Sequence, residues 1–71
     1  MNDNLTQELL RGLQQLCPLA GDMRFGQILA TLGMLGEDMV GRSLWEIADN
    51  ELLEVVERFR QDLDRRVTNV A

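Results

Sequence analysis

Apolar residues recur at intervals of three and four positions in three segments of this chain, and this period decides what the chain can fold into. In the first segment, Leu5, Leu9, Leu13 and Leu16 share one face of a helix. No stretch of convincing length alternates apolar and polar residues, which is the pattern of a half-buried strand. The sequence therefore predicts an all-α fold.

The first helix is expected over residues 4–17. Asn4 is suited to cap it, and Gln7 stands three residues further on, as in a capping box. Pro18 disfavours a helical conformation at Cys17, so the helix should stop there. Cys17 lies at the border of the apolar face, where we expect a buried structural thiol.

The second helix is expected over residues 22–35, with Asp22 as its cap and Gly36 as its left-handed terminator. This helix is apolar or small nearly all round, which is typical of a central helix packed on two sides. Its interior glycines each cost about 1 kcal/mol relative to alanine, and close approach of another helix is the expected compensation. That approach falls on a face of small residues, namely Gly26, Ala30 and Gly33.

The remainder of the chain predicts a loop, a short helix and a long helix. Residues 36–42 are expected to form the loop. Ser43 and Glu46 match the S-x-x-E capping box, which predicts a short helix over about 43–48. A last helix is expected over residues 50–66, where the apolar stripe resumes.

Residues 1–71 are expected to form one domain, a compact bundle of three main helices and a short one. The second helix should lie in the middle, between the first and the last. A chain of this length buries only a small core. The predicted core consists of Leu9, Leu13, Leu16, Phe25, Ile28, Leu29, Leu32, Leu44, Trp45, Ile47, Leu52, Val56, Phe59 and Leu63.

The composition removes most catalytic and metal chemistry. The chain has no histidine, lysine or tyrosine and one cysteine. Serine–histidine triads, histidine acid–base catalysis, Schiff-base lysines and zinc sites built from histidine or several cysteines are therefore excluded. We expect no enzyme, no cofactor and no metal site.

The net charge and the distribution of apolar residues predict the kind of partner and the location. The formal net charge is −5, with twelve carboxylates against seven arginines. Affinity for nucleic acid comes mostly from neutralised phosphates, so a nucleic-acid partner is not expected. No apolar run is long enough to span a bilayer, and the N-terminus lacks the positive region of a signal peptide. Together with the single thiol, this predicts a cytoplasmic protein without a membrane partner.

The leading hypothesis is a small non-catalytic module that binds another protein, with a homodimer left open. The alternative is a transcription-linked regulator, such as an antitoxin-like or phage-derived accessory protein, in which the short helix and the last helix form a helix-turn-helix pair. Trp45 is expected either to anchor an interface or to plug the edge of the core. Met39 likewise suits an adaptable surface or the core. The candidate interaction residues are Gly26, Ala30, Gly33, Met39 and Trp45.

Three short motifs resemble those of a family of short, uncharacterised bacterial proteins: MRFGQIL at residues 23–29, LWEI at 44–47 and DNELL at 49–53. That family carries an R-[FL]-G-Q motif on one helix and a D-x-E-L-L start on the next. The similarity covers roughly residues 22–59. The resemblance implies a bacterial source and a small helical fold. It implies no activity, so no functional residue is carried over.

Overall fold

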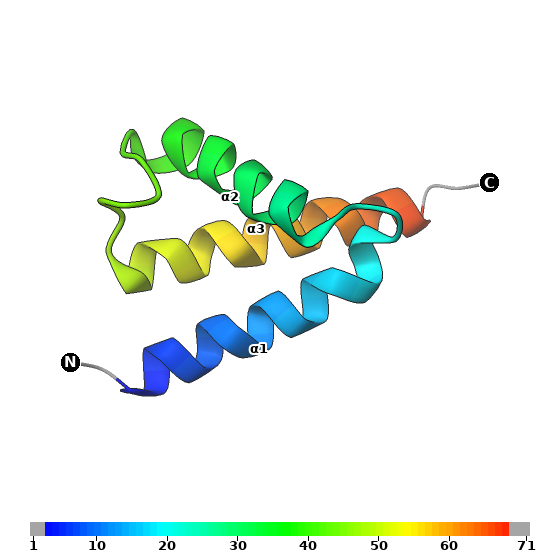
Figure 1. Cartoon of the computed structure of the whole chain (residues 1–71), viewed down its shortest axis with the longest axis horizontal. Coiled ribbons are helices and arrows are strands. Elements are labelled where there is room, and N and C mark those ends of the chain that lie inside the picture. Colours follow the sequence, from blue (N-terminus) through cyan, green and yellow to red (C-terminus); the bar gives the residue numbers. More distant parts are fainter. Residues whose placement is uncertain (1–2, 69–71) are drawn as a thin grey trace.

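The computed structural model of the chain describes residues 3–68, and the side chains of residues 4–66. It contains three helices, α1 (Asp3–Ala20), α2 (Phe25–Val40) and α3 (Asp49–Thr68), and no strand within the described range. The helices form a compact bundle (Figure 1). The prediction of an all-α bundle of three main helices is therefore confirmed.

The central helix is α3, not α2. It packs along α1 and also against α2, whereas α1 and α2 have little contact with each other and diverge on opposite sides of α3 (Figure 1). The expectation that the second helix lies in the middle is wrong. The reason lies in the adjacent residues Val55 and Val56, which are both buried. Neighbouring residues of a helix point about 100° apart, so α3 buries two flanks at once.

The first helix continues through Pro18 to Ala20, so the expected stop at Cys17 is wrong. A proline inside a helix removes one backbone hydrogen bond. The additional residues compensate by burying Ala20 in the core and packing Leu19 against it. The helix ends before Gly21, whose φ of 62° is the left-handed conformation that favours glycine.

Both expected N-terminal caps are displaced. Because α1 begins at Asp3, Asn4 lies within its first turn. The cap of α2 is Arg24 and not Asp22. The backbone N–H of Arg24 donates to Oε1 of Gln27 at 2.8 Å, which closes the start of the helix through the glutamine side chain.

The second helix continues beyond Gly36 to Val40, so the expected terminator and the expected loop at 36–42 are wrong over residues 36–40. Gly36 is buried inside the helix. A Cβ built on it would lie 2.5 Å from Cδ1 of Ile47, so the glycine makes room for this side chain. The terminator is Gly41, with a φ of 78°, whose N–H donates to the carbonyl of Glu37 at 2.9 Å.

The expected short helix at 43–48 is a single turn. The backbone N–H groups of Glu46 and Ile47 both donate to the carbonyl of Ser43, at 2.9 and 3.1 Å. The turn buries Ile47 and leads directly into α3. Consequently this segment does not supply the short helix that a helix-turn-helix pair with α3 would need.

Most of the predicted core is confirmed. Seven of the predicted residues are buried, namely Leu16, Ile28, Leu32, Ile47, Val56, Phe59 and Leu63, and the half-buried Leu9, Leu13 and Leu52 pack against them. The prediction missed Ala20 and Val55, which are also buried. It was wrong for four exposed side chains, Phe25, Leu29, Leu44 and Trp45.

A close approach between helices does occur at a glycine, but in α1. A Cβ built on Gly12 would lie 2.7 Å from Cγ1 of Val56 in α3. Val56 is only 3% exposed and is branched at Cβ, so its side chain has little freedom to move aside. At Gly26 in α2, by contrast, no described atom outside its own helix lies within 4 Å of such a Cβ.

Gly12→Ala and Gly26→Ala should therefore differ in stability. Alanine favours a helix over glycine by up to about 1 kcal/mol at either position. In Gly12→Ala the new methyl overpacks against Val56, at a cost of about 1–3 kcal/mol, so this variant should be the less stable of the two. Denaturant unfolding of both variants measures the difference. Equal midpoints would contradict the close contact between α1 and α3.

Candidate functional site

The five predicted interaction residues all lie outside the buried core. Gly26, Ala30, Met39 and Trp45 are exposed, and Gly33 is half-buried. Trp45 does not plug the edge of the core, because it is 95% exposed, and its role at an interface stays a prediction. This exposure makes Trp45 the starting point for a candidate interaction site.

The structure places three of the five residues on one flank of α2, and Trp45 lies in the turn that approaches this flank through Leu44. Gly26, Ala30 and Gly33 follow one another on a single flank of α2. A Cβ built on Gly33 would meet only the Cβ of Leu44, at an ordinary contact distance of 3.9 Å, and Trp45 is the next residue. Met39 does not belong to this group, because helical spacing places it on the other side of α2.

The small-residue flank of α2 is open, so the expectation that α2 is packed on two sides is wrong. No described atom outside α2 comes within 4 Å of a Cβ built on Gly26, and Ala30 is exposed. The cause is that α1 pairs with α3 and diverges from α2. The chain offers no further helix in its described part to cover this flank.

An apolar hollow of about 100 Å³ lies between α1 and α2, above α3. Leu29 and Leu44, which the sequence placed in the core, stand at its rim with partly exposed side chains. All of its lining residues are apolar, namely Leu9, Leu13, Leu29, Leu32, Leu44, Leu52 and Val56. The sequence showed that Leu29 and Leu44 are apolar. Helical spacing alone does not distinguish a buried core residue from one that lines an open hollow.

We call the hollow and its surroundings the apolar surface. It comprises the hollow together with Gly26, Ala30, Gly33 and Trp45. Leu44 connects the parts, since it lines the hollow, contacts Gly33 and precedes Trp45. None of the residues of the apolar surface carries a charge.

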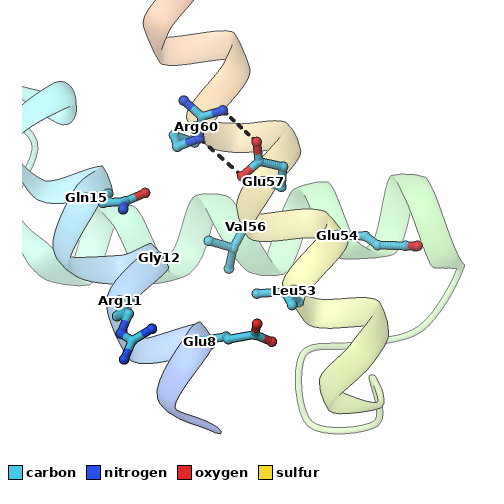
Figure 2. Close-up of a pocket in the computed structure, with 9 residues that line it drawn as sticks. All are labelled: Glu8, Arg11, Gly12, Gln15, Leu53, Glu54, Val56, Glu57 and Arg60. Carbon is cyan, nitrogen blue, oxygen red and sulfur yellow. Dashed lines mark hydrogen bonds and ion pairs between the residues drawn. The ribbon is translucent and has the colours of Figure 1, made fainter. Parts of the chain in front are cut away.

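A larger groove of about 420 Å³ runs along the surface where α1 and α3 meet (Figure 2). Its floor contains the close contact of Gly12 and Val56, with Leu53 beside it. Its rim is of mixed charge and consists of Glu8, Arg11, Gln15, Glu54, Glu57 and Arg60. No group of three or more side chains suited to hold a metal ion exists in the part of the chain that the structure describes.

Two charged residues of this groove neutralise each other. Nε and Nη2 of Arg60 donate to the two carboxylate oxygens of Glu57 at 3.1 and 2.5 Å (Figure 2). The hydrogen bond from Arg60 lowers the pKa of Glu57 and raises the pKa of the arginine itself. The two-pronged contact makes this rim of the groove a paired, solvated surface.

Cys17 is exposed, so the expectation of a buried structural thiol is wrong. The continuation of α1 beyond Pro18 explains the difference. Leu16 and Ala20 take the positions that face the core, and helical spacing leaves Cys17 on the flank.

In comparisons with known proteins, no family model matches the chain, and neither the curated proteins nor the solved structures give a match. The motif resemblance at residues 22–59 therefore stays a prediction. Among the residues that the structure describes, no helix combines the length and the apolar character that crossing a bilayer requires.

Glu57→Gln should reduce stability slightly at neutral pH and have less effect in acid. Because the folded state lowers the pKa of Glu57, its pairing with Arg60 contributes stability at neutral pH and loses it as the pH falls through the folded pKa. The effect is small because the Glu57 side chain is about half exposed, so solvent screens the pair. Unfolding of the two proteins at a series of pH values measures the difference. A gap that widens towards acid would contradict the pairing.

Proposed function

We propose that this chain is a small non-catalytic module that binds another protein through the apolar surface. The observation that carries the proposal is that Trp45 is 95% exposed and directly follows Leu44, which lines an apolar hollow. Contiguous apolar patches on soluble proteins mark interaction sites. Tryptophan is also enriched among the few interface residues that supply most of the binding energy.

The contrast between the faces of the molecule supports the proposal. The apolar surface lacks charge, as the buried centre of a protein interface does. The outer side of α3 instead carries ion pairs at ordinary surface spacing, such as Arg58 with Asp62 at 3.4 Å and Arg65 with Asp62 at 3.5 Å. Such pairs keep a helix face solvated and contribute little to binding. The apolar surface is therefore a better candidate for binding than the outer side of α3.

Composition and charge support a protein partner in a bacterial cytoplasm. The chain lacks the histidine and lysine on which most small catalytic sites rely, which favours a binding role. A net charge of −5 disfavours nucleic acid and favours neutral or basic protein surfaces. The single exposed thiol of Cys17 suits a reducing compartment. The motif resemblance supplies the bacterial setting.

Trp45→Ala should strongly weaken partner binding, while Met34→Ala should leave it unchanged. Met34 is a matched control because it is 68% exposed and lines a separate groove between α2 and α3. Loss of a tryptophan at the centre of an interface weakens binding by at least about tenfold. The 71-residue wild-type and variant chains serve as bait in extracts of the source organism, and captured proteins are then titrated in purified form.

The outcome that supports the proposal is a partner bound by the wild type and by Met34→Ala but not by Trp45→Ala. Equal binding by all three chains would contradict the role of the apolar surface. Circular dichroism of the variants checks that α1, α2 and α3 remain folded. Since Trp45 is almost wholly solvent-exposed, its removal should not unfold the bundle.

A further inference from the structure

The segment between α2 and α3 is tied to α3 by a charged contact. Nη2 of Arg42 donates to Oε2 of Glu51, which lies nine positions further along the chain, and Trp45 stands between the two residues. The ion pairs that involve Glu57 or Asp62, by contrast, join residues of α3 that are three or four positions apart. The contact between Arg42 and Glu51 therefore links two parts of the fold, whereas those pairs stay on one helix.

Glu51 fastens both ends of this segment with one carboxylate. Its Oε2 accepts from Arg42, and its Oε1 accepts from the backbone N–H of Ala48 at 3.2 Å, as the glutamate of a capping box does. The two contacts bracket the turn at residues 43–47. We propose that the ion pair of Arg42 and Glu51, which we call the strap, holds this turn and with it Trp45, and that salt releases the strap without unfolding the bundle. In its consequence for binding, this inference rests on the proposed function.

The other hydrogen bonds of the turn close on the turn itself. The N–H groups of Glu46 and Ile47 donate to the carbonyl of Ser43, and the Ser43 hydroxyl donates to Oε1 of Glu46 at 3.2 Å. These bonds shape the turn but do not attach it to a helix. Packing attaches it at Ile47, which is buried beside Gly36, and in part at Leu44, which is 38% exposed. The strap adds a charged attachment at the N-terminal end of the turn.

Solvent reaches the strap but not the packed attachment. The side chains of Arg42 and Glu51 are 48% and 29% exposed, whereas Ile47 is 7% exposed. Salt weakens an exposed ion pair by screening it, and the Debye length falls from about 10 Å at 0.1 M to about 3 Å at 1 M. The packing of apolar side chains is not screened in this way. Salt should therefore loosen the turn at its N-terminal end and leave the three helices folded.

A turn that is held in place lowers the cost of binding through Trp45. A side chain on a mobile segment must be ordered when a partner binds, and this ordering reduces affinity. Exposed ion pairs contribute little, so loss of the strap should weaken partner binding by no more than about fivefold. That loss is smaller than the one expected for Trp45→Ala. Arg42 thus acts as a positioning residue, through the turn and not through contact with the partner.

Amide hydrogen exchange, followed by NMR on the 71-residue chain, measures opening of the turn without any partner. In Arg42→Gln the N–H groups of Glu46 and Ile47 should exchange faster than in the wild type, by up to about fivefold. Arg42→Lys keeps the positive charge and should stay close to the wild type. In both variants the amides in the middle of α1 and α3 should exchange at wild-type rates, because the bundle stays folded.

Two further variants assign the effect to the strap. Glu51→Gln keeps an oxygen for the N–H of Ala48 but loses the charge, so it should loosen the turn as Arg42→Gln does. The double variant should be no looser than either single variant, since both remove the same contact. Arg58→Gln is the matched control, because it removes an ion pair that lies within α3. It should leave exchange in the turn unchanged.

Salt provides a test on the wild type alone. Exchange at Glu46 and Ile47 should become faster as sodium chloride rises to about 1 M, and Arg42→Gln should respond less. The strap would be overturned by a wild-type turn that is indifferent to salt, by equal exchange in the wild type and Arg42→Gln, or by an equal increase in Arg58→Gln. Because the salt series needs no variant, it decides the matter even if a variant does not fold.

Binding separates the strap from the proposed function. If Trp45→Ala loses the partner while the turn is indifferent to Arg42, the strap fails and the proposed function stands. If the turn loosens in Arg42→Gln while no capture depends on Trp45, the proposed function fails and the strap stands.

Discussion

The fold depends on one helix being shared by two neighbours. Val56 in α3 meets α1 at Gly12, where the missing side chain lets the two helices approach, and Val55 beside it is also buried. Because adjacent residues of a helix diverge by about 100°, α3 is committed on two flanks. A chain of 71 residues has no further helix in its described part to close the remaining space between α1 and α2. The hollow is the direct consequence of this shortage.

The same constraint accounts for the charge distribution around the bundle. The outward side of α3 is free to carry ion pairs because its two apolar flanks are already covered. α2 has only one covered flank, which buries Ile28 and Leu32, and its second flank of small residues stays open. A helix with apolar or small residues nearly all round usually lies in the middle of a domain. Here it lies at the side, and the uncovered flank adjoins the apolar hollow.

The sequence predicted the number and the type of the main helices, because periodic spacing over four or more turns has one reading. It did not predict where the helices end, because a single proline or glycine can stand either at the end of a helix or inside it. Pro18 is typical of a helix end, but α1 continues through it to Ala20, which is buried. Gly36 is typical of a left-handed helix terminator, but it lies inside α2 and makes room for Ile47. Gly41 terminates the helix instead. Which helix is central depends on contacts between helices, which spacing within one helix does not contain.

The exposure of Trp45 follows from the packing role of Gly36 in α2. The turn at 43–48 carries three large apolar side chains, Leu44, Trp45 and Ile47, and only Ile47 is buried. Ile47 is accommodated because Gly36 has no side chain, so that Cδ1 of the isoleucine takes the place of a Cβ. Once Ile47 is fixed inward, the hydrogen bonds of the turn leave Leu44 at the rim and Trp45 outside. Thus a glycine inside α2 makes room for the isoleucine that points inward, and Trp45, the only tryptophan of the chain, is left exposed to solvent.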